Sequence, residues 1–167
     1  MEKRIILERI EYKDDFKYFA QLAFNEEVMK MNMGRVFTPE EAEEYFLYIL
    51  KLNTANKNAG TYKVFFENDT TFIGIGSLWI RKDGSEVEYM VLPEYWGQGY
   101  ATEIVNNLLE IAKQTPTIKK VRGLITPGNI TSKKVLTKNG FTFERTFNVK
   151  EDNSVVEIYC KVMNIIS

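Results

Sequence analysis

The sequence predicts a mixed α/β (α+β) fold, in which a mostly antiparallel sheet of about seven strands carries about four helices on its faces. Two observations predict it. Apolar residues recur at helical spacing in some segments and at a period of two in others, and the two kinds of segment alternate along the chain. The resulting order is β-α-α-β-β-β-α-β-α-β-β. A chain of 167 residues without a linker or repeat fits a single domain over residues 1–167.

The N-terminal third of the chain predicts one strand and two helices. Residues 4–10 are apolar enough for a strand, and residues 14–25 carry apolar side chains at helical spacing. A second helix begins at Thr38, because Thr-Pro-Glu-Glu over residues 38–41 is a capping box with Pro at the first helical position. Residues 26–37, between these helices, contain three Met and show no clean period, so we expect an irregular connection there.

The remaining elements follow the switch between the two periods. Three strands joined by short polar turns predict an antiparallel meander over residues 61–67, 72–81 and 85–92. Two helices are predicted over residues 100–113 and 129–139, the second ended by Gly140. Further strands are predicted over residues 119–126, 141–149 and 155–163, and the last two form a hairpin.

Composition excludes several classes of site. The chain has no histidine, which rules out a Ser-His-Asp triad, a Cys-His pair and a histidine metal site. The lone Cys160 rules out an internal disulfide and a Cys-rich zinc site, so no metal is expected. A net charge of -1 gives no electrostatic reason to expect a nucleic-acid partner. Without a long apolar run or a signal peptide, we expect a cytoplasmic protein with no membrane partner.

The most informative segment is residues 87–103, which predict a strand, a loop with two glycines and the start of a helix. The N-terminus of a helix offers unpaired backbone N–H groups and the positive end of the helix dipole. Gly97 and Gly99 remove the side chains that would keep an anion away from those groups. This arrangement suits a phosphate or pyrophosphate.

Two common phosphate-binding designs fit this loop poorly. A P-loop requires Gly-Lys-Ser/Thr, whereas the chain has Gly99-Tyr100-Ala101. A dinucleotide fingerprint requires a third glycine where Thr102 stands, and an acidic residue about twenty positions further on, where the chain is basic. The loop also follows an antiparallel meander and does not open a βαβ unit.

A third design fits better. Trp96-Gly-Gln-Gly-Tyr-Ala101 resembles the pyrophosphate loop of the GNAT superfamily of N-acetyltransferases, usually written Gln/Arg-x-x-Gly-x-Gly/Ala. Trp96 replaces the usual Gln or Arg, as is common in the branch that contains the ribosomal-protein N-terminal acetyltransferases of the Rim type. Residues 129–141 resemble the later Asn-x-x-Ser…Gly-Phe motif of that branch, and residues 38–42 resemble its helix start. The resemblance covers nearly the whole chain and implies the GNAT fold.

The resemblance also implies how acetyl-CoA, as co-substrate, would bind. The strand before the loop would separate from its neighbour, and the pantetheine arm would lie in the gap. Asn129 would bond this arm from the other side, and Lys133 or Lys134 would reach a phosphate. The arm would bond the backbone of Met90, Val91 and Leu92. The pyrophosphate would contact Trp96, Gly97, Gln98, Gly99, Tyr100 and Ala101, with Thr102 close by.

The implied reaction is direct transfer of acetyl from the thioester to an amine, which needs no enzyme nucleophile. Glu86 and Glu88 share one face of a central strand and are candidates for the general base, although solvation, a salt bridge or a water chain are alternatives. Many GNAT enzymes place a tyrosine acid on the late helix, where this chain has Leu136. Ser132 on the same helix is a candidate proton donor for the thiolate, or else a pantetheine contact.

Two classes of function compete at this point, beside a nucleotide-cofactor dehydrogenase, whose nicotinamide binding a thermal-shift screen would expose. The first is an acetyl-CoA-dependent N-acetyltransferase that acts on a primary amine of a small molecule or of a protein N-terminus, as a monomer or homodimer. The irregular stretch that contains Met29, Met31 and Met33 would line its acceptor site or fill the core. The second is a non-catalytic module that binds acyl-CoA as a sensor, which turnover with a panel of amines would exclude.

Overall fold

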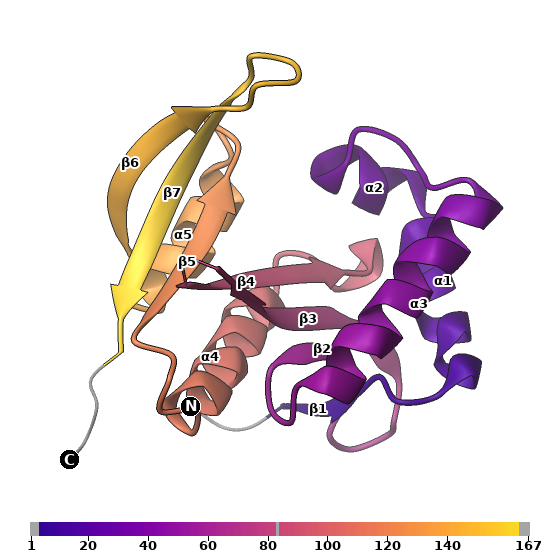
Figure 1. The fold of residues 1–167 in the computed structure, drawn as a ribbon. Helices are drawn as coiled ribbons and strands as arrows, with labels where there is room; N and C mark the ends of the chain where they lie inside the picture. The colour runs from indigo at the N-terminus through magenta and orange to yellow at the C-terminus, as the bar shows by residue number, and fades with distance from the viewer. Residues whose placement is uncertain (1–3, 83, 164–167) are drawn as a thin grey trace.

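The protein is described by a computed structural model that covers residues 4–82 and 84–163 (Figure 1). Seven strands form one sheet in the order β1-β2-β3-β4-β5-β7-β6. The strands are β1 (Ile5–Arg9), β2 (Gly60–Phe66), β3 (Phe72–Arg81), β4 (Gly84–Val91), β5 (Lys120–Ile125), β6 (Thr142–Asn148) and β7 (Val155–Val162). All neighbouring strands are antiparallel except β4 and β5, which are parallel. The predicted fold class is confirmed.

Five α-helices and two short 3-10 turns accompany the sheet in the described residues. The helices are α1 (Phe16–Ala23), α2 (Glu26–Asn32), α3 (Pro39–Ala55), α4 (Tyr100–Lys113) and α5 (Ile130–Lys138). The turns are η1 (Lys13–Asp15) and η2 (Pro93–Tyr95). The predicted capping box at Thr38 is present, since its hydroxyl accepts from the Glu41 N–H and the Glu41 carboxylate accepts from the Thr38 N–H.

The helix α2 is a departure from the sequence prediction, which expected an irregular connection over residues 26–37. Its start is capped by Asn25, whose side chain accepts a hydrogen bond from the backbone N–H of Val28 at 3.1 Å. Its buried side chains are Val28 and Met29, two consecutive positions. A helix this short with two adjacent buried residues shows no 3.6-residue period, which is why the pattern was missed.

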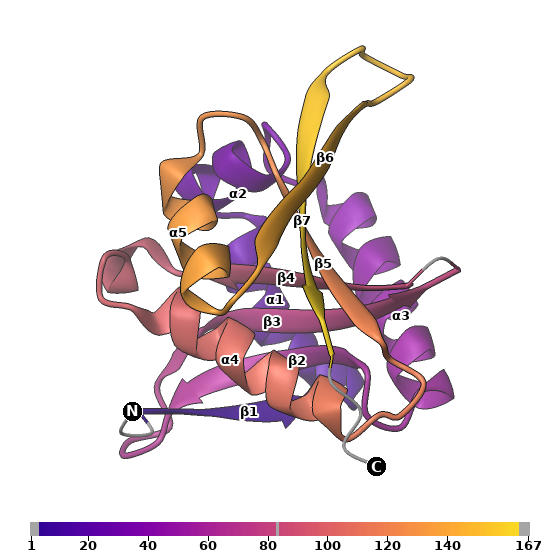
Figure 2. The same ribbon diagram turned by 90° about the vertical axis from the view of Figure 1, so that its left-hand side faces the viewer.

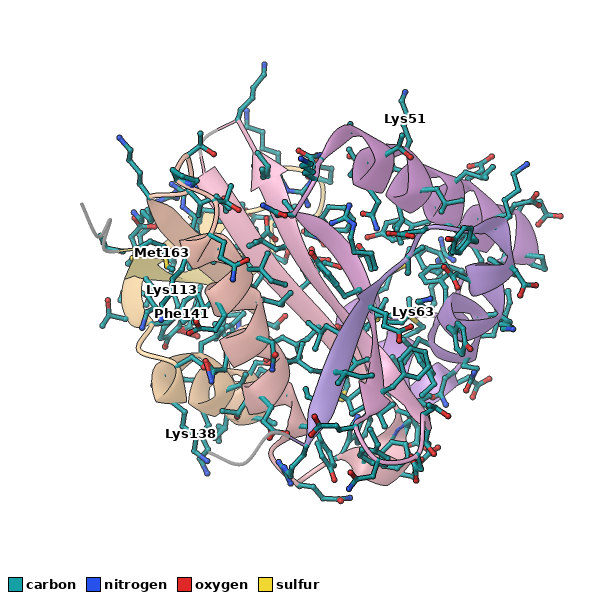
Figure 3. The ribbon with its side chains drawn as sticks, turned by 90° about the horizontal axis from the view of Figure 1, so that it is seen from below. Lys51, Lys63, Lys113, Lys138, Phe141 and Met163 are labelled. Carbon is teal, nitrogen blue, oxygen red and sulfur yellow. The ribbon has the colours of Figure 1, made fainter. Side chains whose placement is uncertain are left out.

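The sheet lies between two groups of helices. Figure 3 shows α4 and α5 on one side of it and α1 to α3 on the other, and Figure 2 shows α4 crossing the strands β1 to β4. Each side has its own apolar core, with Leu78 and Val87 on the α4 side and Ile75 and Trp79 on the α3 side. Because both faces are covered, the first eight residues of β3 are all buried. Among the described residues, no helix is long and apolar enough to cross a membrane.

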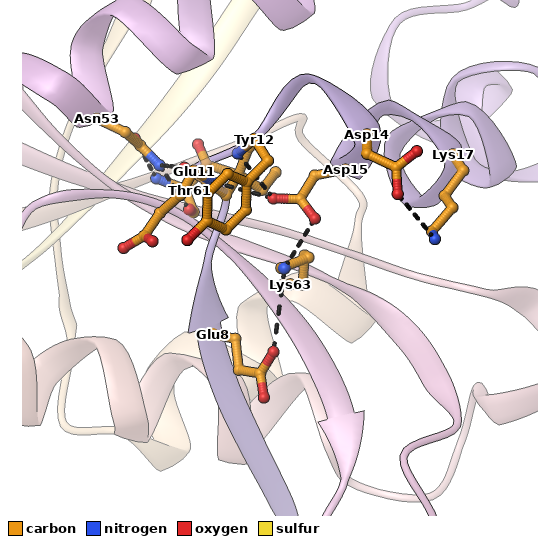
Figure 4. A network of polar contacts seen from close by, with 10 residues as sticks. Glu8, Glu11, Tyr12, Asp14, Asp15, Lys17, Asn53, Thr61 and Lys63 are labelled. Atoms are coloured by element: carbon orange, nitrogen blue, oxygen red, sulfur yellow. Dashed lines mark hydrogen bonds and ion pairs between the residues drawn. The ribbon is translucent and has the colours of Figure 1, made fainter.

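A buried ion pair joins the sheet to the N-terminal helices (Figure 4). The Nζ atom of Lys63 on β2 lies 2.9 Å from Oδ1 of Asp15, and both side chains are about nine-tenths buried. The second carboxylate oxygen of Asp15 accepts from the backbone N–H groups of Glu11 and Tyr12. Neither partner is left unsatisfied, so this polar contact fixes where α1 begins relative to the sheet.

The strands β4 and β5, which α4 connects, form a parallel βαβ unit that the sequence interpretation did not expect, and they separate soon after they meet. In the described residues they are paired at Ser85 with Val121 and at Glu86 with Arg122, and the rest of β4 has no pairing on that side. In an extended strand, the N–H and C=O groups of one residue point to the same edge and those of the next residue to the opposite edge. The separation therefore leaves alternate backbone groups of β4 facing a gap inside the sheet.

Candidate active site

A cavity of about 490 Å³ opens where β4 and β5 separate. One wall comes from β4, β5 and α5, and the other from β3, α2 and α3, so the cavity reaches through the gap between the strands. Glu86, Glu88 and Ser132, the three candidates for catalysis from the sequence, all line it. The fold thus brings together residues that lie more than forty positions apart in the chain.

The two glutamates differ in environment. The side chain of Glu86 is 17% exposed, and its Oε2 lies 3.5 Å from Nε of Arg81, whereas Glu88 is exposed. Burial raises the pKa of Glu86, and the nearby negative charge of Glu88 adds to this effect. Arg81 lowers the pKa of Glu86, but by less than burial and Glu88 raise it. A carboxylate with a raised pKa inside a cleft is suited to exchange protons with a substrate.

Two tyrosines that sequence reasoning missed also line the cavity. Tyr89 on β4 and Ser132 on α5 both line the cavity, and the Ser132 hydroxyl acts to lower the pKa of the phenol. Burial raises the pKa of Tyr89. Tyr45 on α3 has a pKa raised to about 12 by burial and by the charge of Glu88. Both phenols therefore stay protonated at neutral pH and can donate hydrogen bonds.

The sequence contained no clear signal for either tyrosine. Tyr89 stands next to Glu88, but consecutive residues of a strand point to opposite faces, so this adjacency does not bring the two side chains together. Tyr45 belongs to α3 and packs on Phe19 and Phe37, so it has the appearance of an ordinary core residue. Leu136, where a tyrosine acid was considered, is 2% exposed and fits against Gly123, where a Cβ would lie 2.5 Å from its Cδ1.

The glycine loop connects β4 to α4. Gly97 and Gly99 have φ values of 73° and 85°, in the left-handed region that favours glycine. Gly99 is the N-cap of α4. Because glycine has no side chain, it makes no capping hydrogen bond to the first N–H groups of α4. The indole Nε1 of Trp96 donates to the carbonyl oxygen of Val91 at 2.7 Å. Trp96 thereby ties the loop back to the end of β4.

Arg4 supports this loop from the first strand. Its Nη2 donates to the carbonyl oxygen of Gln98 at 3.0 Å, and its Nε pairs with the buried Glu103 at 3.1 Å. Its guanidinium also lies 4.3 Å from the centre of the Tyr100 ring. Sequence reasoning missed Arg4 because more than ninety residues separate it from the loop. The only sequence signal was Glu103, a carboxylate on the apolar face of an amphipathic helix.

The backbone of β4 presents one of the three expected pantetheine contacts toward the gap. The N–H of Leu92 donates to the carbonyl oxygen of Ile73 at 2.8 Å and so faces β3. Val91, one residue earlier, faces the opposite edge, as its bond from Trp96 also shows. By the same alternation Met90 faces β3 with its backbone, although its side chain lines the cavity. Tyr89 and Val91 are the residues with backbone groups toward the gap.

The remaining residues expected to contact the cofactor lie at the junction of α4 and α5. Asn129 is the N-cap of α5, and its side-chain oxygen accepts from the N–H of Ser132 at 3.1 Å. This cap uses the oxygen of the amide and leaves its NH₂ group for another partner. Thr102 lies in the first turn of α4, where its carbonyl oxygen accepts from the side chain of Asn139. Lys133 and Lys134 are exposed on α5.

Relatives of known sequence support one family. The chain matches an acetyltransferase (GNAT) domain over residues 4–142. It is 29% identical over 150 residues to the FsC-acetyl coenzyme A-N(2)-transacetylase of Aspergillus fumigatus, a match that covers 81% of this chain and 62% of that longer protein. It is 25% identical to the uncharacterized N-acetyltransferase YnaD of Bacillus subtilis, over 87% of this chain and 83% of YnaD.

Solved structures share the fold. The ribosomal L7/L12 alpha-N-protein acetyltransferase RimL, in complex with coenzyme A, superposes with a TM-score of 0.80 at 16% identity, over 99% of this chain and 97% of that one. The spermidine N-acetyltransferase of Vibrio cholerae, in complex with coenzyme A and spermine, superposes with a TM-score of 0.78 at 17% identity, over 97% of each chain. The domain match spans the separated strands and the glycine loop described above, and the protein belongs to the acetyltransferase (GNAT) family.

Proposed function

We propose that this protein is an acetyl-CoA-dependent N-acetyltransferase that transfers acetyl from the thioester to a primary amine of a small molecule or a protein N-terminus. The separation of β4 and β5 beside Glu86 carries the proposal. It provides a gap lined by backbone groups for the pantetheine arm and a carboxylate at the inner end of that gap. The names of the relatives and the family of the chain agree with this chemistry.

The proposed position of acetyl-CoA follows from the two ends of the gap. The diphosphate lies on the N–H groups of residues 96–101, where the positive end of the α4 dipole favours an anion. Arg4, paired with Glu103, holds this loop through its bond to the carbonyl oxygen of Gln98. The pantetheine arm runs along β4, where the backbone of Tyr89 and Val91 faces the gap, and the NH₂ group of Asn129 bonds it from the side of α5.

The proposed chemistry needs a base, a donor for the oxyanion and an acid. Glu86, with its raised pKa, removes a proton from the acceptor ammonium directly or through water. The amine nitrogen then attacks the thioester carbonyl, and the N–H of Val91 donates to the oxygen that becomes negative. As the carbon–sulfur bond breaks, Tyr89, beside Ser132, supplies a proton to the thiolate, and the second proton that the substrate nitrogen loses as the amide forms returns to the phenolate. A positioned acid or base contributes about 10²–10⁴-fold.

Steady-state acetyl transfer tests this function. The purified protein is incubated with acetyl-CoA and a panel of amine metabolites, antibiotics and N-terminal peptides, and thiol release is followed together with the mass of the product. We expect amine-dependent thiol release with a matching acetylated product. Binding of acetyl-CoA without turnover across the panel would instead support a non-catalytic acyl-CoA-binding module, and failure to bind acetyl-CoA would refute both.

The proposal includes the wider predictions made from the sequence. We propose that residues 1–167 form one N-acetyltransferase domain that acts in the cytoplasm as a monomer or homodimer. Its partners are acetyl-CoA and the amine acceptor, without nucleic acid or membrane. The near-neutral charge of the chain supports the absence of a nucleic-acid partner.

A further inference from the structure

A second cavity, of about 310 Å³, adjoins the proposed active site. Glu86 and Leu124 line both cavities, so the second one begins where the first one ends. Its remaining walls come from the end of β3, the start of β4, β5, β6 and β7. It therefore lies beside the carboxylate that we propose as the base, on the side toward the C-terminal hairpin.

The second cavity is strongly basic. Its lining includes Arg81, Arg122 and Arg145, against Glu86 as the one acidic group among the described residues that line it. Lys120 and Glu144 contact each other nearby, and their charges cancel. Positive charge gathered in a concave site with low-dielectric walls attracts anions. Guanidinium groups in particular match the geometry of carboxylates and phosphates.

A β-bulge places Arg145 in this cavity. Phe143 pairs with Tyr159 across the hairpin, whereas Arg145 pairs with Ile158, so Glu144 is an extra residue in β6. Regular alternation would give Arg145 the same face as Phe143. The bulge instead turns Arg145 to the face of Ile158, which lines the cavity. Bulges of this kind commonly redirect a side chain beside an active site.

Arg145 is also the arginine best placed to receive a ligand. It is exposed, and its guanidinium lies 6.0 Å from the ring of Phe147, which lines the same cavity. Arg81 is partly engaged by Glu86 and also lies over the ring of Trp79. Arg122 is 19% exposed and lies near Glu144. Arg81 and Arg122 each lie close to a glutamate. Among the described residues, Arg145 makes no ion pair that an incoming anion would have to displace.

A buried donor in the first cavity, opposite Glu86 in the strand register, also lacks an acceptor within the described part of the chain. Trp79 lines the first cavity and is 3% exposed, and its Nε1 has no hydrogen-bond partner among the described residues. It pairs across the sheet with Glu86 and lies under Arg81. A buried N–H without a partner is costly, and an oxygen atom of a bound ligand would satisfy it.

We infer that this arginine cavity binds an anionic group on the acceptor, so that the preferred substrate is a primary amine that also carries a carboxylate or phosphate. The inference rests on the proposed function for the identity of the first cavity. The amine lies at Glu86, and the anion extends past Leu124 toward Arg145. The ammonium group of such an acceptor faces Glu86, and its anionic group faces Arg145.

Matched pairs of amines test this inference. Phosphoethanolamine is compared with ethanolamine, and γ-aminobutyrate and ε-aminocaproate with their amino alcohols, in the acetyl-transfer assay. A peptide with acidic residues after its N-terminus, compared with its amide counterpart, separates a peptide source of the anion from a free metabolite. We expect a KM about tenfold lower for the anionic member of the preferred pair, and a loss of this preference as salt is added.

Arg145→Gln should raise the KM of the anionic amine about tenfold and leave that of its neutral partner unchanged. Arg145→Lys should restore part of the preference, because it keeps the charge but not the bidentate geometry. Lys51→Gln is the matched control, since it removes one positive charge from the exposed side of α3, where Lys51 points into solvent (Figure 3). It should change neither KM.

The failures of the two proposals are distinguishable. Equal turnover of both members of every pair, with no effect of Arg145→Gln, would overturn the inference and leave the acetyltransferase intact. If no amine is acetylated, calorimetric titration with phosphoethanolamine still tests the cavity. Binding that is weakened by Arg145→Gln and not by Lys51→Gln would support the anion site, and absence of binding would refute it.

Discussion

The indole nitrogen of Trp96 and the carbonyl oxygen of Val91 lie 2.7 Å apart, which closes the loop between β4 and α4 onto the strand from which it starts. One side chain thus sets the distance between the proposed pyrophosphate site and the proposed pantetheine site. It also explains how Trp can stand where the resembling loops have Gln or Arg. In this chain Trp96 ties the loop to β4, and Arg4, paired with Glu103, bonds the loop at the carbonyl oxygen of Gln98.

Trp96→Phe should weaken acetyl-CoA binding without changing the chemistry. The variant keeps an aromatic ring but loses the N–H that bonds Val91, a contact of about 1 kcal/mol, which corresponds to a KM for acetyl-CoA about fivefold higher. Steady-state kinetics at saturating amine measure this change. A kcat that falls as much as kcat/KM would contradict a purely positioning role for Trp96.

Gly97→Ala should raise the KM for acetyl-CoA more than its effect on stability explains. A Cβ at Gly97 meets no described atom within 4 Å, so the variant adds left-handed strain, of about 1 kcal/mol, and a methyl group in the anion loop. Gly34→Ala is the matched control, because Gly34 has a similar φ and an equally open Cβ position in another connection, the one between α2 and α3. Both should lose similar thermal stability, and only Gly97→Ala should affect acetyl-CoA.

Glu86→Gln should remove the rise of kcat/KM with pH that reflects the base. The raised pKa of Glu86 keeps it protonated at low pH, so activity increases as pH rises through that pKa. Arg81 lowers this pKa, and Arg81→Gln should therefore move the rise to higher pH. All pH profiles are measured with the same amine, one that carries no anionic group, so that titration of the acceptor contributes equally to each profile. Glu88→Gln is the matched variant. If the rise of kcat/KM with pH is lost only in this variant, Glu88 and not Glu86 is the base.

Tyr89→Phe should lower kcat tenfold or more if the phenol helps to protonate the thiolate, given the usual contribution of a positioned acid of about 10²–10⁴-fold. Ser132→Ala should lower kcat by a similar factor, and the double variant by little more, if the two hydroxyl groups act as one unit in the cavity. Replacing the thiol leaving group by one of lower pKa should reduce the effect. Fully additive losses would argue for separate roles.

Lys63→Met should destabilise the fold by about 3 kcal/mol, because it leaves the carboxylate of Asp15 buried without its cation. Lys113→Met, in the exposed pair with Glu110, should cost less than about 1 kcal/mol. Denaturant unfolding of both variants measures the difference. Equal losses of unfolding free energy would mean that the buried pair contributes no more to stability than the exposed pair.

The pH dependence of stability should follow Asp15. Burial raises its pKa, but the hydrogen bond from Lys63 and those from the N–H groups of Glu11 and Tyr12 outweigh burial, so its pKa is lowered in the fold. A lowered pKa stabilises the fold above the unfolded value of about 4, and this stabilisation is lost as pH falls through the folded value. In the Asp15→Asn variant, the free energy of unfolding should change less with pH over that acidic range.

Local sequence patterns predicted most of the elements. The strand over residues 72–81 and the helix over residues 100–113 have the predicted bounds, since their periods are long and uninterrupted. The helix α2 was missed because it is short and capped by Asn25, with adjacent buried residues. Glu86, Glu88 and Ser132 were found because a motif and a period of two marked them, and the cavity contains all three.

The sequence by itself determined the elements, the glycine loop and the family resemblance, because each depends on backbone preferences and side-chain patterns within a few consecutive residues. Only the tertiary structure decided which distant groups meet there. Arg4 reaches the loop from β1, Tyr45 reaches the cavity from α3, and a bulge turns Arg145 toward the second cavity. These positions depend on how β4 separates from β5 and how both faces of the sheet are packed, and no short segment of the chain encodes that geometry.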